Sequence, residues 1–512
     1  MTGFAIICTL PLVNGATIPP SPGITPTPIL RVGDRLETLS YDRERRDLSG
    51  IISSITAIPA AVTSYLGALP SDVANGILPA YTGLPTADDI KAKYNLTDEQ
   101  IDAEPLQVLN VPGYANWTSN GWQLRMHGTA YKQPPLSDSQ IDDAAKPFLP
   151  NLNTSSLNSS ELAESRNLTA SLLVIPQSGV TLDFLLTFGE DEGDVANFTL
   201  SGQTDAIGEF NEWVGLGSLS GKNVPDGQGG LNTTVVNVVS GQDANSELIG
   251  VVCAAGNATA YFPSTEGVTI VADIDDILRI TQIYSPEDGL DNSFAYAYRP
   301  WMNMPEIFQN WSISVPNIHF HYLTTTPEQV TRAYESFVYS EYPLGSFDVR
   351  PENFTTIDQT LSIRKVTLFQ ILETFPNRSF VLIADTSNPD VMQDYPLARA
   401  TFGSQVSCIL LRNTSATDDK DHFPYDTSGF EGIDNSTYMF FRTPDDLKDI
   451  DIANGGCRNT SFAQNVTFEY QGLPSNLSGL TNAAGHSSFA PWTFGGWGLV
   501  VAGVTVMILS GV

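Results

Sequence analysis

The sequence has few of the residues that bind nucleic acid or soft metal ions. Only 25 lysines and arginines stand against 57 aspartates and glutamates, which gives a formal net charge of -32. Because phosphate backbones are bound by clustered Lys and Arg, this balance argues against a nucleic-acid partner. The 4 cysteines and 5 histidines show no CxxC or Cys/His spacing of a zinc site. The 512 residues are nevertheless 41% apolar, so we expect folded domains.

The small number of cysteines limits the disulfides that the chain can form. Cys8 lies in an N-terminal apolar run and would be removed with a secretory leader. The others, Cys253, Cys408 and Cys457, permit one disulfide and one free thiol. Because Cys408 and Cys457 both fall in or after the C-terminal folded region, we predict that these two residues pair.

Apolar, uncharged segments mark both ends of the chain. A short apolar run followed by small residues predicts a signal peptide over residues 1–16. Residues 495–512 form a second apolar run, which small residues and a spacer precede. This order predicts a GPI-attachment signal over residues 483–512, with the anchor joined to Asn482. A retained transmembrane tail is the alternative.

Asn-X-Ser/Thr sequons are denser than a chain of this composition requires. The 16 sequons indicate selection for surface glycans, although a Ser/Thr-rich chain also produces idle ones. Together with the terminal segments, they predict a secreted glycoprotein that a GPI anchor holds at the extracellular face of the plasma membrane or at the cell wall. The asparagines are Asn95, Asn116, Asn153, Asn158, Asn167, Asn197, Asn232, Asn257, Asn310, Asn353, Asn377, Asn413, Asn435, Asn459, Asn465 and Asn476.

Composition divides the chain into successive regions. A Pro-rich and then charged linker or pro-segment follows the leader, and its Arg45-Arg46 pair is either a processing site or a solvated charge run. Short alternating runs separated by Gly, Asn and Asp indicate a sandwich-like β domain with a Ser- and Asn-rich insertion at 137–169. The predicted regions are 17–47 (linker), 48–120 (mixed, with short acidic helices in 88–104), 121–265 (β-rich), 266–458 (α/β) and 459–482 (glycosylated stalk).

From residue 267 onward, continuous apolar strands alternate with helical segments. Alternation of this kind predicts an α/β fold with a doubly wound parallel sheet. The predicted strands of this part are 268–273, 318–323, 380–385 and 406–411, and the predicted helices are 327–339, 363–375 and 391–402. In the preceding β region, the predicted strands are 122–128, 170–175, 180–188 and 233–239.

Polar side chains follow these strands at the edge where an open parallel sheet binds its ligands. Asp273 and Asp275 end the first strand, Thr324 follows the second, and Asp385 ends the third. Lys365 opens the helix before the third strand. A carboxylate can attack phosphorus, and a second one nearby can transfer protons. Since Mg²⁺ prefers carboxylate and phosphate oxygens, and Lys and Thr hold phosphoryl oxygens, the set predicts Mg²⁺-dependent phosphoryl transfer through an aspartyl phosphate.

The run Val271-Ala-Asp-Ile-Asp-Asp-Ile-Leu-Arg-Ile-Thr281 resembles the DxDx(T/V) motif of the haloacid dehalogenase superfamily. It is also similar to a segment of the actin-patch phosphatidate phosphatase family. Residues 320–327, 342–346 and 380–387 resemble that family in the same order, and 122–128 looks like the start of its β domain. The resemblance implies a haloacid dehalogenase-like catalytic domain that hydrolyses phosphatidate to diacylglycerol.

The resemblance also implies a role for each candidate residue. Asp273 would be the nucleophile and Asp275 the general acid and base. Thr324 and Lys365 would bind the phosphate group. The Mg²⁺ ligands would be Asp273, Asp275 (through its backbone carbonyl), Asp385 and Asp390.

The sequence departs from the family pattern at three places. Ile277 stands where the family has Thr, and Thr325 replaces a usual Asn. The loop 384–390 lacks the glycines of the family, which stiffens its backbone. Activity or substrate would differ if these changes reshape the site.

Plainer explanations exist for each residue. Aspartates at strand ends often cap turns, a lysine on a helix is usually solvated, and Asp390 is placed to cap the helix at 391–402. His319 and His321 share one face of a strand, where packing is expected rather than metal binding. Two other functions therefore stay open: a phosphatase of a soluble phosphomonoester, and a catalytically decayed glycosylated surface protein.

Overall fold

The computed structural model describes residues 86–471 except 150, 188–193, 223, 228–234, 241–256, 284–285, 351–356, 418–424, 462, 465 and 469. All of them belong to one compact unit. The predicted signal peptide, the linker and the GPI-attachment signal with Asn482 lie outside the described residues. Within the described part of the chain, no helix is long and apolar enough to cross a membrane.

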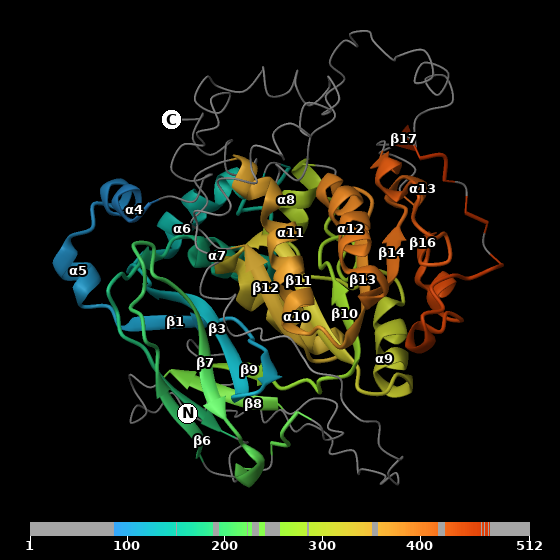
Figure 1. The fold of residues 1–512 in the computed structure, drawn as a ribbon. Coiled ribbons are helices and arrows are strands. Elements are labelled where there is room, and N and C mark those ends of the chain that lie inside the picture. The colour runs from blue at the N-terminus through green and yellow to red at the C-terminus, as the bar shows by residue number, and fades with distance from the viewer. Residues whose placement is uncertain are drawn as a thin grey trace, which may run out of the picture. The chain divides into compact units, whose positions relative to one another are not determined.

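A parallel sheet of six strands forms the centre of the fold (Figure 1). Its spatial order is β12-β11-β10-β13-β14-β16, and every neighbouring pair is parallel. The chain moves outward from β10 to β12 and then resumes on the other side at β13, so the strand order reverses between β10 and β13. The strands are β10 (Gly267–Ala272), β11 (His319–Pro327), β12 (Ser346–Arg350), β13 (Arg378–Asp385), β14 (Val406–Arg412) and β16 (Tyr438–Phe441). The predicted α/β class with a parallel sheet is confirmed.

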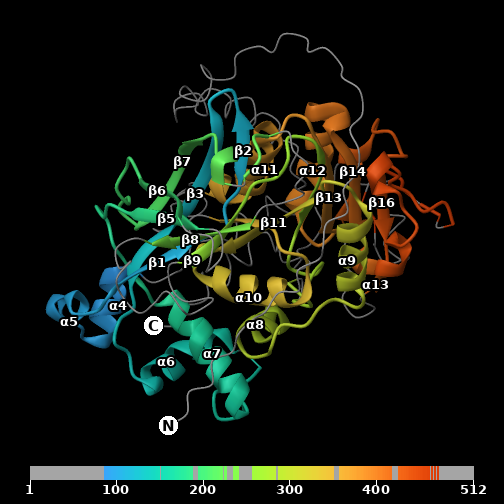
Figure 2. The same ribbon diagram turned by 90° about the horizontal axis from the view of Figure 1, so that it is seen from below.

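Helices cover both faces of this sheet, as Figures 1 and 2 show. The helices α9 (Met304–Ser314) and α10 (Thr331–Glu341) pack with Ile270 of β10 in one apolar cluster. The helices α11 (Ile357–Thr374) and α12 (Pro389–Phe402) pack with Val271 in a second cluster. Because neighbouring residues of a strand face opposite sides of the sheet, β10 must be apolar at both positions. This explains the continuous apolar run.

The start of α10 differs from its prediction. The sequence predicts a helix from residue 327, but β11 continues to Pro327, which pairs with Arg350 of β12. A 3₁₀ turn, η6 (Glu328–Val330), then leads into α10. Strand β12 and helices α8 (Pro286–Phe294) and α9 were not predicted. The helices predicted at 363–375 and 391–402 correspond to α11 and α12.

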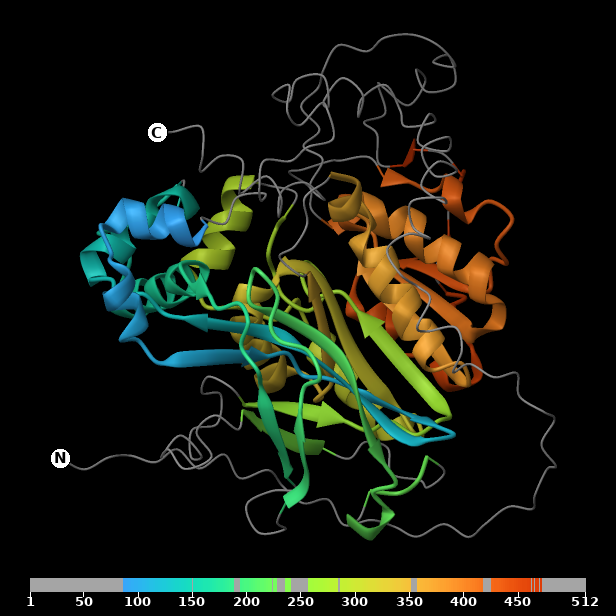
Figure 3. The same cartoon turned by 60° about the vertical axis from the view of Figure 1, so that its left-hand side comes forward.

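Two antiparallel sheets precede the parallel one, and Figure 3 shows their strands in blue to green. The first contains β1 (Leu106–Asn110), β2 (Ala115–Thr118), β3 (Gly121–Lys132), β4 (Ile175–Pro176) and β7 (Glu209–Gly217). The second contains β5 (Asp183–Thr187), β6 (Asp194–Thr199), β8 (Val235–Ser240) and β9 (Asn257–Tyr261). A separate sandwich-like domain remains a prediction. The small elements at the two ends are α4 (Ala87–Tyr94), α5 (Asp98–Asp102), α13 (Thr414–Thr417), β15 (Tyr425–Asp426) and β17 (Tyr470–Gln471).

One predicted strand of this region is wrong. Residues 170–175 do not form a strand; the helix α7 (Ser159–Leu172) occupies the first half of this stretch, and only the short β4 follows it. The cause is a strong helix start, because the side chain of Asn158 accepts the N–H groups of Ser160 and Glu161. The insertion at 137–169 is accordingly helical, with α6 (Asp138–Ala145) before α7.

A buried ion pair joins the antiparallel strand β3 to the edge of the parallel sheet. Arg125 of β3 contacts Asp348 of β12, and both side chains are almost fully buried. His321 lies 3.2 Å from the other carboxylate oxygen of Asp348. Although burial raises the pKa of Asp348, the Arg125 charge and the His321 contact hold that pKa well below its usual range. His321 and His319 both bond to Ser346, as expected for packing residues.

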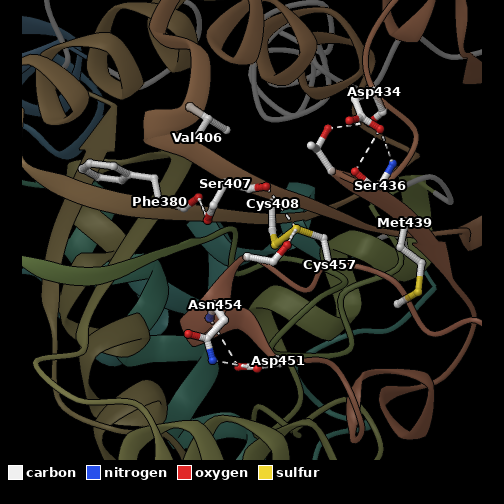
Figure 4. Close-up of a disulfide and its surroundings, with 12 residues drawn as sticks. Phe380, Val406, Ser407, Cys408, Asp434, Ser436, Met439, Asp451, Asn454 and Cys457 are labelled. Carbon is white, nitrogen blue, oxygen red and sulfur yellow. Dashed lines mark hydrogen bonds between the residues drawn. A yellow bond between two sulfur atoms is a disulfide. The ribbon is translucent and has the colours of Figure 1, made fainter.

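A disulfide links strand β14 to the C-terminal loop (Figure 4). It joins Cys408 and Cys457, whose Cα atoms are 5.3 Å apart and which are 49 residues apart in the sequence. The predicted pairing is therefore confirmed. Cys253 lies outside the described residues.

Candidate active site

The candidate residues gather at the carboxyl ends of β10, β11 and β13. Asp273 follows β10 and Asp385 ends β13. Thr324 lies in the second half of β11. Asp273 and Asp385 are 1% and 0% exposed, so neither carboxylate is a solvated turn residue. Because the strand order reverses between β10 and β13, the two carboxylates stand at the topological switch point of the sheet, where open α/β folds bind ligands.

Asp273 is held by polar groups on both of its carboxylate oxygens. One oxygen accepts the N–H of Ile274 at 2.9 Å. The other lies 3.0 Å from a guanidinium nitrogen of Arg364 and accepts the side-chain amide of Asn388 at 3.1 Å. A carboxylate oriented in this way is fixed in position before any substrate binds.

The cation beside Asp273 is Arg364, and not its neighbour Lys365. Arg364 is 1% exposed in its side chain and also donates from Nε to Asp390 at 2.9 Å. Lys365 is partly exposed and lies near Asp394; burial raises the pKa of Asp394 to about 8, and the Lys365 charge opposes that rise. Since successive helical residues point about 100° apart, only one of the two can face the sheet edge. The structure therefore gives Arg364 the place that the sequence predicted for Lys365.

Asp385 is oriented by the loop that leads into α12. Its Oδ1 accepts the Ser387 N–H at 2.6 Å and the Thr414 hydroxyl at 3.2 Å. Its Oδ2 lies 3.4 Å from the amide nitrogen of Asn388. Asn388 thus spans Asp273 and Asp385, and it belongs to the loop in which the sequence departs from the family.

Burial and like charge act on both carboxyl groups. Burial raises the pKa of Asp273 to about 7; the Arg364 charge opposes this rise, and the charges of Asp385 and Asp275 add to it. Burial likewise raises the pKa of Asp385 to about 6, with a further contribution from Asp276. Two buried carboxylates that repel one another favour a positive partner between them.

Asp275 faces a separate group of hydroxyls. It accepts hydrogen bonds from Tyr334 at 3.0 Å, from Thr326 at 3.2 Å and from Thr281 at 2.8 Å. Arg279 Nε lies 3.6 Å away. These donors come from β11, α10 and the loop after β10, so three parts of the chain fix the orientation of this carboxylate.

Asp276 shapes the loop that carries Asp273 and Asp275. Its carboxylate accepts the N–H groups of Thr281, Gln282 and Ile283 at 2.7–3.0 Å. Its φ of +57° is uncommon for a non-glycine residue, and the three hydrogen bonds hold it there. Ile277 follows it and is fully buried in the apolar cluster of α9 and α10, so its side chain is a core residue.

The other predicted residues have local partners. The hydroxyl of Thr324 accepts the Thr326 N–H at 3.1 Å and is buried. The carboxylate of Asp390 accepts hydrogen bonds from Arg364 and from the N–H of Val391 near the start of α12, so both of its oxygens already have partners. Roles for Thr324 in phosphate binding and for Asp390 in metal binding stay predictions.

The donor set fits a magnesium ion only in part. No group of three or more His, Cys, Asp or Glu in the described ranges is arranged to hold a metal ion. Mg²⁺, however, is usually bound through one or two carboxylates, with waters and substrate phosphate as its remaining ligands. Asp273 and Asp385, with their mutual repulsion, fit that pattern. The carboxylate of Asp275 instead accepts hydrogen bonds from hydroxyl groups, and that of Asp390 contacts Arg364.

Sequence reasoning missed Arg364, Asn388 and Tyr334. A basic residue beside Lys365 and an Asn three residues after Asp385 were visible in the sequence. Nothing in the sequence, by contrast, pointed to a tyrosine 59 residues away from Asp275.

Comparison with known families agrees with this geometry. Residues 268–413 match the model of a family described as phosphatidate phosphatase APP1, catalytic domain. The match runs from β10 to the residue after β14 and includes every candidate catalytic residue, but it covers less than half of the chain. The resemblance to the phosphatidate phosphatase family is confirmed for this region, and the match implies a phosphatase. No match to a curated protein was found.

Proposed function

We propose that the chain is a Mg²⁺-dependent phosphatase that hydrolyses a lipid phosphate, with phosphatidate as substrate and diacylglycerol as product. The observation that carries the proposal is the buried group of Asp273, Arg364 and Asp385 at the switch point of a sheet that matches the phosphatidate phosphatase catalytic domain.

The first chemical step is attack of an Asp273 oxygen on phosphorus. A phosphorus–oxygen bond to Asp273 forms, the bond to the diacylglycerol oxygen breaks, and Asp275 gives that oxygen a proton. In the second step, water attacks the aspartyl phosphate while Asp275 accepts its proton. Inorganic phosphate leaves and the Asp273 carboxylate is restored.

Arg364 provides the fixed positive charge of this mechanism. Its guanidinium already lies 3.0 Å from Asp273, so a phosphoryl group on that carboxylate would meet it directly. Such preorganised charge stabilises the negative oxygens of the transition state. Asp273 and Asp385 would hold Mg²⁺, which supplies further charge neutralisation to the phosphoryl group when bound.

We further propose that the protein works at the outer face of the plasma membrane or at the cell wall. The Cys408–Cys457 disulfide supports this place, because structural disulfides persist in oxidising compartments. A GPI anchor would raise the effective concentration of the enzyme at a lipid substrate.

The predicted sequons support the same proposal. Most of those whose side chains the structure describes present an exposed asparagine: Asn95, Asn153, Asn158, Asn167, Asn197, Asn310, Asn377 and Asn435. Asn116, Asn413 and Asn459 are half-buried, and the Asn116 amide donates to the Thr374 carbonyl at 3.3 Å. The side chains of Asn232, Asn257, Asn353, Asn465 and Asn476 lie outside what the structure describes.

The experiment that tests the proposal is phosphate release from phosphatidate in mixed micelles. Secreted protein would be assayed with Mg²⁺ and with chelator, as wild type, as Asp273→Asn and as Asp449→Asn, a control at an exposed aspartate where the change creates no sequon. We expect Mg²⁺-dependent release that only Asp273→Asn abolishes. Release from a soluble phosphomonoester but not from phosphatidate would indicate the first alternative. No release from folded protein on either substrate would indicate a non-catalytic surface protein.

A further inference from the structure

A small cavity lies away from the catalytic carboxylates, between the first antiparallel sheet and the start of α10. It has a volume of about 80 Å³, which is room for several waters or one small anion. Neither Asp273 nor Asp275 contributes to its wall. Its lining includes Thr129, Tyr131, Asn167, Ser171, Gln329 and Arg332.

Two polar atoms of this wall are buried without a partner. They are Nη2 of Arg332, which can only donate, and Oε1 of Gln329, which can only accept. Gln329 is 9% exposed, so its amide oxygen is cut off from bulk water. Buried polar groups are normally hydrogen-bonded, and an unmatched donor and acceptor in one cavity require an occupant with both an acceptor and a donor.

The charge of Arg332 is not neutralised by its carboxylate neighbour. Burial raises the pKa of Glu335 to about 8, although the Arg332 charge opposes the rise, so burial favours the uncharged form of Glu335. Arg332 also lies over the ring of Tyr131, 5.3 Å from its centroid, and hydrogen-bonds with that tyrosine. A guanidinium in this setting favours an anion over water.

We propose that this cavity binds a small protonated oxyanion of the phosphate type. An unprotonated oxygen of the anion accepts from Nη2 of Arg332, and its P–OH group donates to Oε1 of Gln329. Sulfate has the same shape and, near neutral pH, no proton to donate, so the Gln329 oxygen discriminates against it. The cavity is too small for a lipid, so inorganic phosphate is the ligand, and the site is distinct from the one that hydrolyses substrate.

The test is calorimetric titration of the full chain with inorganic phosphate, with sulfate as the comparison and ionic strength held constant. Because the catalytic site also attracts phosphate, the titrations use chelator and the Arg364→Gln background. We expect one phosphate per chain, bound about tenfold or more tightly than sulfate. Arg332→Gln in that background should weaken phosphate binding about tenfold or more, whereas Arg299→Gln, which removes an exposed positive charge, should leave it unchanged.

Two further variants separate ligand binding from folding. Gln329→Leu should reduce the preference for phosphate over sulfate, and Ala170→Leu should fill the cavity while Arg332 is retained. Unchanged thermal midpoints without phosphate would establish that the variants are folded. The proposal is overturned if Arg364→Gln binds no phosphate, if binding survives Arg332→Gln, or if sulfate binds as well as phosphate. None of these readouts depends on catalysis, so they stand apart from the test of the proposed function.

Discussion

At the scale of single residues, Arg364 and Lys365 offer a matched pair of adjacent cations. Arg364 contacts Asp273 and is buried, whereas Lys365 is partly exposed. We expect Arg364→Gln to lower kcat/KM for phosphatidate by about 10²–10³-fold, because it removes charge that acts on the transition state. Lys365→Gln should change kcat/KM by no more than about twofold. Steady-state phosphate release from both variants would measure this.

The opposite ranking would contradict the assignment. A large loss in Lys365→Gln with little loss in Arg364→Gln would mean that the lysine reaches the phosphate after substrate binds. Arg364→Lys is a useful third variant. It keeps the positive charge but loses the planar guanidinium that contacts both Asp273 and Asp390, so partial activity is expected.

The sequence could locate this helix but not its rotation. Strand-end aspartates are constrained by the sheet, so Asp273 and Asp385 were found correctly at one edge. A helix residue depends on rotation, and an error of one position turns the side chain by about 100°. Two adjacent basic residues therefore could not be separated without the packing of α11 against β11 and α12.

Tyr334 gives a second prediction at this scale. Its hydroxyl lies 3.0 Å from both carboxylate oxygens of Asp275 and so orients the proposed general acid. Tyr334→Phe should lower kcat about tenfold and leave KM for phosphatidate nearly unchanged, because the lost hydrogen bond acts on the chemical step. Tyr298→Phe is the control: this tyrosine packs against Tyr334 but bonds to the Ser293 carbonyl. Equal losses in both variants would point to packing instead.

At the scale of elements, the disulfide attaches the C-terminal loop to the middle of the parallel sheet. Removing it in the double variant Cys408→Ala/Cys457→Ala should lower the free energy of unfolding by about 2–4 kcal/mol, since the bond restricts the unfolded chain over 49 residues. Urea unfolding under oxidising conditions would measure the loss. Cys253→Ala should cause no such loss if that thiol is free, and a loss there would show that the pairing is different.

The elements that the sequence predicted best are those buried on both sides. Continuous apolar runs mark strands β10, β13 and β14 at residues 270–272, 380–384 and 408–411, because helices cover both faces of the sheet there. Strand β12 is short and carries Asp348 and Arg350. Its Phe347 and Val349 join the apolar cluster of α9 and α10, but Asp348 pairs with Arg125, and no local pattern reveals a partner 223 residues away.

The prediction for the stretch that forms α7 was wrong for a related reason. Its C-terminal part carries the buried Leu168 and Leu172, and the buried apolar residues 173–175 follow it, so periodicity alone did not distinguish strand from helix. The capping box at Asn158 and Glu161 was the local evidence for a helix, and it lay within a stretch interpreted as a glycosylated insertion.

At the scale of the whole molecule, several of the scarce positive charges lie in the interior. The chain has 25 Lys and Arg residues and a net charge of -32, yet Arg125, Arg279, Arg364 and Arg378 are all buried. The surface is therefore strongly acidic and should be repelled by anionic lipid. A membrane anchor and a divalent cation would both offset that repulsion, which links the proposed location to the proposed chemistry.

Linkage between proton and metal binding gives the last prediction. The folded pKa values of Asp273 (about 7) and Asp385 (about 6) both lie above the ordinary aspartate value of 3.8. At pH values between the ordinary aspartate pKa and these raised pKa values, the folded state keeps protons that the unfolded state releases. Metal-free protein should therefore lose stability as pH rises from about 4 to about 7.

Magnesium should reverse that loss, because the cation binds the ionised pair. We expect Mg²⁺ to raise the thermal midpoint, relative to chelator, more at about pH 8 than at about pH 5. Asp394 and Glu335 also have raised pKa values, but neither contacts Asp273 or Asp385, so the difference between Mg²⁺ and chelator removes their contribution. In Asp273→Asn/Asp385→Ala, which removes both carboxylates without creating a sequon, that difference should vanish. A Mg²⁺ effect that does not grow with pH, or that survives in the double variant, would place the ion elsewhere and leave Arg364 as the main positive charge at the phosphoryl site.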